Sequence, residues 1–203
     1  MVEKLINPFF YIAGKKSLIL GLLIIIATSI IGYYSRTFFP DIISIKIGAN
    51  FPFQYFIVQN MLNWLVASTL FYLGSLLLSK SSVRMVDIYG TQALARFPYF
   101  FASFTGFSGG LNLFGKYLLW TFMKHGEPIE ISTMEKFSAV SIIIISMGLT
   151  IWMVALMFNA FKISANLKGA KLILTFTTVM IISLVVLSYV SKLIILKIPS
   201  ISN

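Results

Sequence analysis

The stretch Ser17–Tyr34, SLILGLLIIIATSIIGYY, decides the fold class of this chain, because it carries no charge and is long enough to cross a membrane. A helix rises about 1.5 Å per residue, so this run reaches roughly 27 Å, close to the ~30 Å of a bilayer's hydrocarbon core. Lys15 and Lys16 precede it, as basic residues precede the apolar part of a signal peptide. The run exceeds the roughly 7–15 apolar residues of such a signal, and no small-residue cleavage site follows. We therefore interpret it as a retained first span.

The composition of the whole chain supports the same class. Of 203 residues, 58% are hydrophobic and 11% are charged, and the mean hydropathy is +0.92. A water-soluble domain of this size cannot bury so much apolar surface, so lipid covers part of it. We predict an all-α integral membrane protein with a single membrane domain over residues 1–203.

The charge balance indicates lipid rather than nucleic acid as a partner. Lys and Arg number 16 against 6 Asp and Glu, which gives a net charge of +10. Basic residues beside spans set orientation and contact anionic headgroups. No basic run interleaved with aromatic residues lies outside the spans, so we expect no nucleic-acid partner. The absence of cysteine excludes disulfides and thiolate chemistry.

Five apolar stretches, each bounded by charge or by Pro and Gly, predict a bundle of five transmembrane helices over residues 17–34, 56–78, 99–123, 138–161 and 172–195. The third stretch differs because it contains Gly106, Gly109, Gly110 and Gly115. The Gly106 to Gly110 spacing permits close helix contact, which favours a packed span. The same glycines also permit a broken or re-entrant segment. In that case four crossings remain and the C-terminus changes sides.

The orientation follows from the basic residues near the ends of the spans. With the N-terminus inside, nine Lys and Arg lie in inner segments and six in outer segments, and Lys116 lies within a span. The excess predicts a cytoplasmic N-terminus and an outer C-terminus. On the outer side, Ile43–Ile47 and Pro128–Ser132 alternate with period two and are rich in β-branched residues. We predict two short extended segments there that pair as a ribbon.

The residues do not support an enzyme. Gly106–Gly110 reads G-F-S-G-G and satisfies the G-x-S-x-G pattern of serine hydrolases, including rhomboid-type intramembrane proteases. The only histidine, His125, is at the outer end of the same predicted span, about 25 Å of helix from Ser108. The motif therefore indicates helix packing. We expect no catalytic residue, no cofactor and no metal site, since the glutamates of the 127–135 loop have no recognised ligand spacing.

Polar side chains within the predicted spans are the first candidate positions. Polar groups are expensive in hydrocarbon and usually pair with each other or with backbone. These residues are Asn60, Asn63, Asn112, Lys116 and Asn159, with Gln59 beside them. We interpret the amides as hydrogen bonds between helices and Lys116 as reaching toward the interface. The alternative is a polar path lined by these amides and the glycine-rich third span.

Two connections on the predicted cytoplasmic side give the second candidate positions. One contains Gly90–Pro98, GTQALARFP, and the other contains Asn159–Gly169, NAFKISANLKG. Both fall on one membrane face, so we expect their polar residues to form an interaction cluster near the surface. The members are Asp87, Gln92, Arg96, Asn166 and Lys168. Ordinary helix termination at Pro98 and Gly169 explains the same residues equally well.

These two stretches and the five-span layout resemble the short bacterial branch of the Yip family, membrane proteins named in eukaryotes for interacting with Rab-type GTPases. The resemblance covers about residues 7–196. It implies a multi-span scaffold with a cytoplasmic N-terminus in a bacterial cytoplasmic membrane; the eukaryotic members are associated with vesicle trafficking and membrane shaping. This chain has about 16 residues before its first span, whereas those relatives carry a longer cytoplasmic region, so Rab binding is not carried over.

Two functions follow as hypotheses. The first is a non-enzymatic scaffold or interaction partner in membrane organisation or trafficking, which binds lipid and associates with other membrane proteins or with itself. The second is a small transporter or channel component. The first expects the cytoplasmic cluster to converge, and the second expects a continuous polar cavity at Asn60, Asn63, Asn112 and Lys116.

Overall fold

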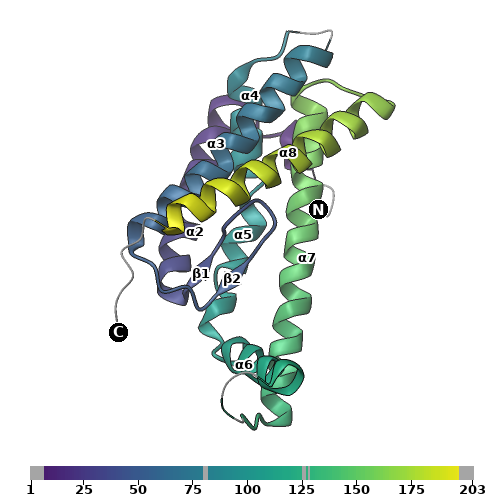
Figure 1. Ribbon diagram of the computed structural model, residues 1–203. Helices are drawn as coiled ribbons and strands as arrows, with labels where there is room; N and C mark the ends of the chain where they lie inside the picture. Colours follow the sequence, from purple (N-terminus) through teal and green to yellow (C-terminus); the bar gives the residue numbers. More distant parts are fainter. Residues whose placement is uncertain (1–6, 80–81, 125–126, 128, 197–203) are drawn as a thin grey trace.

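The computed structural model describes residues 7–79, 82–124, 127 and 129–196, and most of them are helical (Figure 1). Within these described residues, four helices are long and apolar enough to cross a membrane. They are α2 (Gly14–Ser35), α3 (Phe53–Leu78), α7 (Thr133–Ser164) and α8 (Gly169–Leu196). These four helices contain the first, second, fourth and fifth predicted spans, which are thereby confirmed as helices.

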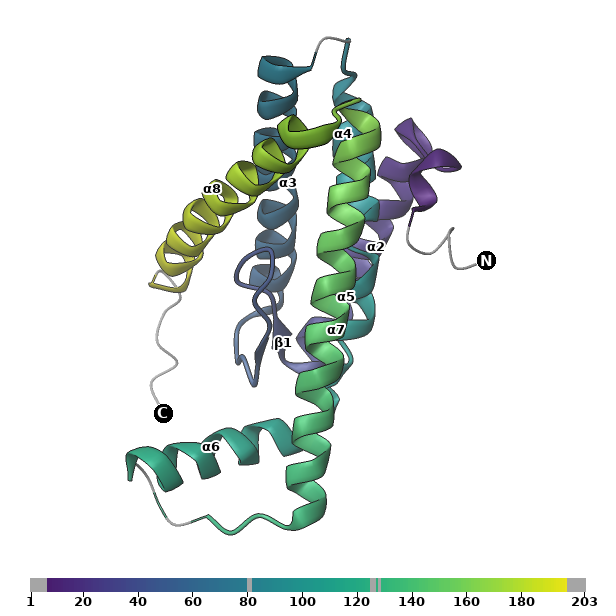
Figure 2. The same cartoon turned by 90° about the vertical axis from the view of Figure 1, so that its right-hand side faces the viewer.

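The third predicted span is wrong as a single helix. Its residues are divided among α5 (Phe97–Ala102), the 3-10 turn η2 (Thr105–Phe107) and α6 (Gly110–Met123). Ser108, between η2 and α6, has an extended backbone with ψ of 106°. The cause is the glycine-rich sequence that follows, which gives the helix little intrinsic stability. Helix α6 then lies across the direction of α7, near the end at which α7 (Thr133–Ser164) begins (Figure 2).

A shorter helix, α4 (Met85–Leu94), precedes α5 and packs inside the bundle. Helix α4 leads into α5 through a turn at Ala95–Arg96. Pro98 explains the turn, since proline has no N–H and disfavours helical backbone before it. Together α4 and α5 run alongside α2 and in the same direction. A Cβ built on Gly90 would lie 2.5 Å from Ser17 Oγ near the start of α2, and Ser35 at its end donates a 2.6 Å hydrogen bond to the Ser103 backbone oxygen.

The predicted ribbon exists in part. Strand β2 (Lys46–Ile47) lies within the expected segment, but its partner is β1 (Thr37–Phe38) in the same loop, in an antiparallel pair. Residues 129–132 form no strand, and Pro128 lies outside the described residues. The pairing was wrong because a strand immediately after α2 closes a short loop, which costs less entropy than joining two distant loops.

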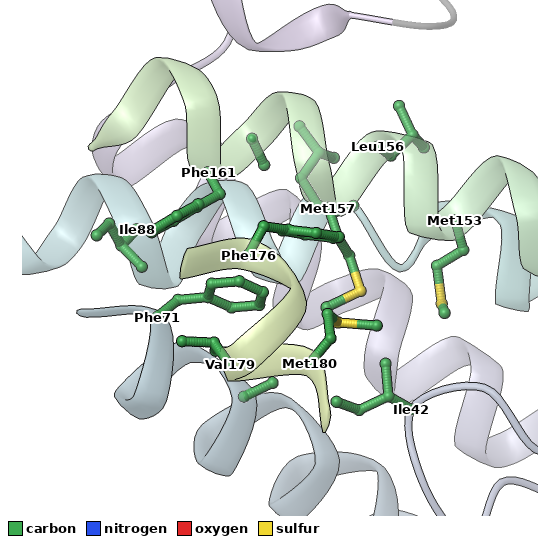
Figure 3. Packing of buried hydrophobic residues seen from close by; sticks show 14 of the residues in the cluster. Ile42, Phe71, Ile88, Met153, Leu156, Met157, Phe161, Phe176, Val179 and Met180 are labelled. Atoms are coloured by element: carbon green, nitrogen blue, oxygen red, sulfur yellow. The ribbon is translucent and has the colours of Figure 1, made fainter. Parts of the chain in front are cut away.

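The main hydrophobic core lies where α3, α7 and α8 meet (Figure 3). Phe71 of α3 stacks with Phe176 of α8 at a 5.4 Å ring separation and also contacts Phe161 of α7 at 4.8 Å. Three methionines, Met153, Met157 and Met180, extend this core. Methionine fits irregular gaps of this kind because its side chain is unbranched and flexible.

Candidate functional site

The amides of α3 fasten the outer loop to the bundle. Asn63 Nδ2 donates to the backbone oxygens of Phe39 at 2.7 Å and Asp41 at 3.0 Å, and Asn63 Oδ1 accepts from Gln59 Nε2 at 2.9 Å. Gln59 Nε2 also donates to Pro40 O at 2.7 Å. These groups are buried. The predicted role of the intramembrane amides as hydrogen-bonding groups therefore holds for Asn63, although its partner is a loop backbone.

Asn60, one turn away on α3, bonds to α2. Its Nδ2 donates to Ser29 Oγ at 2.9 Å, and Ser29 Oγ in turn donates to the backbone oxygen of Ile25 at 2.8 Å. The link joins two adjacent helices through side chains that are both buried. Asn60 thus has the interhelical role that the sequence predicts.

The remaining predicted intramembrane positions lie in different parts of the structure. Lys116 is exposed on α6, which extends away from the bundle (Figure 2). Asn159 is half-buried on α7. The backbone of Asn112 belongs to α6, while its side chain lies outside the described part of the chain. The five predicted positions therefore do not come together at one place.

The predicted cytoplasmic cluster divides into two groups. Asp87 lies at the end of the bundle, where its backbone oxygen accepts from Thr91 Oγ1 at 2.7 Å and from Ser164 Oγ at 3.3 Å. Asn166 and Lys168 are exposed in the α7–α8 connection that follows Ser164. These three residues share one end of the molecule, as predicted.

Gln92 and Arg96 lie inside the bundle, so their predicted place at the surface is wrong. Gln92 is 1% exposed and donates to the backbone oxygen of Met157 at 3.1 Å, and Arg96 is 4% exposed. The reason is that α4 packs against α2 along its length and does not form a surface loop. Glycine at the contact makes this approach feasible, since Gly21 faces the backbone of Ala93.

Arg96 borders a small internal void. Its Nη2 has no hydrogen-bond partner among the described residues, and neither has the Oγ1 of Thr28, which also lines the void. Ile25, Asn60 and Tyr99 complete the lining, and the volume is about 10 Å³. A void of this size accepts roughly one water molecule. Sequence reasoning missed Thr28 and Tyr99 here, because a threonine and a tyrosine within apolar runs carry no signal of their own.

The end of the bundle that holds Asp87 is strongly basic. The exposed basic residues there come from the starts of α2 and α8, the approach to α4 and the end of α7. They are Lys15, Lys16, Arg84, Lys162, Lys168 and Lys171. Asp87 is the acidic residue among them in the described part of the chain. In the connection between α6 and α7, Glu127 and Glu130 accompany Lys124, and Glu135 and Lys136 follow at the start of α7.

The G-x-S-x-G stretch is used in part for close packing. The Gly106 N–H donates to Thr37 Oγ1 at 3.1 Å, and a side chain at position 106 would collide with the Ser35 backbone oxygen. Gly109 has open space around it. His125 lies outside the described residues.

An apolar groove of about 540 Å³ opens between the β1–β2 loop, α6 and α7. Its walls are formed by Ile43, Ile45, Ile47, Leu111, Ile143, Ser146, Met147, Thr150 and Ile151. No sequence pattern indicates this groove, since its walls come from three separate segments, at residues 43–47, 111 and 143–151.

The long apolar helices define the class of the protein, a helical integral membrane protein. Its buried amides Asn60, Asn63 and Gln92 bond to backbone or to a neighbouring helix. Comparison of the chain with protein-family models, with curated proteins and with solved structures finds no match.

Proposed function

We propose that this chain is a non-enzymatic, Yip-like membrane protein that acts as a scaffold or interaction partner, and that it associates with proteins or further copies through its basic end. The exposed cations of this end are the main support for the proposal. The α7–α8 connection lies at the same end and exposes Asn166 and Lys168. An acidic protein surface is the complementary partner. A bacterial cytoplasmic membrane, with trafficking or membrane organisation as the process, remains the setting we propose.

The two stretches that resemble the Yip family touch one another, which supports treating them as one unit. Thr91 Oγ1 of the first lies 2.9 Å from Ser164 Oγ of the second, in hydrogen-bond contact. Both stretches therefore shape the same end of the bundle. Gln92 and Arg96 are buried within the bundle and are not contact residues for a partner.

We further propose five membrane crossings, with α4 and α5 together forming the third. Their parallel course beside α2 supports this. Gly90 of α4 lies against the first turn of α2, and Ser103, directly after α5, accepts a hydrogen bond from Ser35, the last residue of α2. The basic end is then cytoplasmic by the excess of Lys and Arg, and the C-terminus lies outside.

The transporter alternative receives less support. It requires a connected polar cavity at Asn60, Asn63, Asn112 and Lys116. Asn60 and Asn63 are occupied by hydrogen bonds, and the void that Asn60 borders holds about 10 Å³. Lys116 is on the outlying helix α6.

Photocrosslinking in native membranes tests the partner. A photoreactive residue at Asn166 should capture a protein or a second copy, and Lys168→Glu should reduce the yield because it reverses the charge beside the probe. Lys192→Glu is the matched control, since Lys192 is also exposed but lies near the other end of α8. Capture of lipid alone, or equal loss with both variants, would contradict the proposal.

The absence of cysteine allows a clean test of the crossings. Ser82→Cys and Glu130→Cys place single thiols before α4 and after α6, both at exposed positions. Five crossings expect a membrane-impermeant thiol reagent added outside to label position 130 and spare position 82. Labelling of both from the same side would mean that α4 and α5 do not cross.

A further inference from the structure

The apolar groove between the β1–β2 loop, α6 and α7 has a depth in the membrane that can be estimated. Helix α7 carries no charged residue between Lys136 and Lys162. Met147, in the groove wall, is eleven residues from the first and fifteen from the second. At about 1.5 Å per residue these separations are roughly 16 Å and 22 Å. The groove therefore lies at the depth of hydrocarbon, where acyl chains are the abundant molecules.

The walls of the groove are apolar, as expected for a surface that faces hydrocarbon. Ile143, Met147 and Ile151 stand at successive turns on one face of α7. Ile43 and Ile47 belong to the alternating loop segment, which directs every second side chain to the same side. Met147 is 60% exposed and Ile151 is 67% exposed. The groove therefore opens sideways, toward lipid.

Two hydroxyls are the polar groups of the lining. Thr150 Oγ1 donates to the backbone oxygen of Ser146 at 2.9 Å, so its proton is used within α7. Ser146 Oγ has no hydrogen-bond partner among the described residues. A single hydroxyl with apolar neighbours on every side provides no charge that would select a headgroup.

The composition of the groove suits a hydrocarbon chain as its occupant. The groove has a volume of about 540 Å³, and its walls are apolar apart from two hydroxyls. A hydrocarbon chain is far narrower than a helix and can bend to follow the wall. Left empty, the groove would forfeit the dispersion contacts of its lining atoms.

We propose that this groove is a binding site for one acyl chain of a membrane phospholipid, held by packing without recognition of the headgroup. The site is distinct from the basic end that carries the proposed function, and neither depends on the other. The lipid would fill the space between the outlying helix α6 and the body of the bundle, and so support α6 at its angle to α7.

Native mass spectrometry of the detergent-purified chain tests the site. The protein is exchanged into an equal mixture of phosphatidylethanolamine and phosphatidylglycerol with identical chains and then washed in detergent. Unaltered protein should retain one phospholipid, with both headgroups represented equally. Retention of none, or of one headgroup almost exclusively, would overturn the proposal.

Paired variants separate groove binding from general lipid contact. Ile143→Trp with Met147→Trp should fill the groove and lower retention about tenfold, the ratio that corresponds to roughly 1.4 kcal/mol. Ile181→Trp with Val185→Trp is the matched control, since both residues are 57% or more exposed on α8 with the same spacing. Equal loss in the control would overturn the site.

Two further measurements identify the occupant. Ser146→Ala should leave retention unchanged, because an acyl chain makes no use of the hydroxyl, and a marked fall would refute the acyl-chain assignment. The mass spectra also report dimers. A dimer that the groove variant alone abolishes would mean that a second copy occupies the groove. Equal unfolding midpoints in dodecyl sulfate for the two tryptophan pairs would show that lost retention does not reflect misfolding.

Discussion

Replacing Gly21 with alanine tests the contact between α2 and α4, which brings Arg96 and Gln92 inside the bundle. A Cβ at position 21 would lie 2.5 Å from both the backbone carbon of Ala93 and the backbone nitrogen of Leu94. It would also collide with the Ala93 side chain. Backbone atoms cannot rotate away, so the two helices must separate to admit one methyl group.

The expected loss of stability is the balance of two effects. Overpacking in a close contact costs about 1–3 kcal/mol. The helix gains roughly 1 kcal/mol when alanine replaces glycine in its interior. Because two of the three collisions at Gly21 involve backbone, we take the upper part of the packing range. The net expectation is a loss of about 1–2 kcal/mol in the free energy of unfolding.

Unfolding by dodecyl sulfate in mixed micelles, followed by circular dichroism, measures this change. Gly148→Ala is the matched control, since Gly148 is within α7 and nothing lies within 4 Å of a Cβ built there. It should be neutral or stabilising by up to about 1 kcal/mol. The difference between the two variants isolates the helix contact from helix propensity.

A second substitution tests the geometry more closely. Adding Ala93→Gly to Gly21→Ala removes the collision with the Ala93 side chain but leaves the two backbone contacts. The second substitution should therefore restore only part of the free energy of unfolding that Gly21→Ala loses. If Gly21→Ala proves as harmless as Gly148→Ala, then α4 does not pack on α2 at this distance, and the burial of Arg96 and Gln92 loses its basis.

Two other substitutions examine the buried polar groups. Asn63→Ala removes the hydrogen bonds that hold the loop after β1, and should lower the free energy of unfolding by about 1–3 kcal/mol; Gln54→Ala, at an exposed position of the same helix, should change it by less than about 0.5 kcal/mol. Arg96→Met should be neutral or stabilising in the same titration, since it removes a buried cation with an unpartnered nitrogen and keeps most of the volume. A loss above about 3 kcal/mol for Arg96→Met would instead indicate that the guanidinium makes an essential bond.

The membrane class and four of the helices could be read from sequence because they rest on local properties. A run such as Ser17–Tyr34 must hide its backbone polar groups and expose apolar side chains to lipid, whatever its neighbours do. The hydrogen-bonding role of Asn60 and Asn63 followed for the same reason, since an amide in hydrocarbon needs a partner. Which partner it would find was beyond the sequence.

The position of α4 inside the bundle depended on packing between segments distant in the sequence. Met85–Leu94 contains Asp87 and Gln92 and reads as a polar connection. It lies inside the bundle because Gly21 and Gly90 allow close approach to α2, and because its polar groups find partners in α7. Hydropathy assigns each residue its own preference and contains no term for such a partner.

Sequence alone therefore determined that this chain belongs in a membrane and that its intramembrane amides need hydrogen-bond partners. It also gave the bounds of the four long helices to within about five residues. Tertiary structure alone decided that Arg96 is internal, that α6 turns aside from the bundle, and that a groove forms between segments distant in the chain. The physical reason is range: burial in hydrocarbon acts on each stretch separately, whereas close packing and hydrogen bonding act only between surfaces that the fold has already brought together.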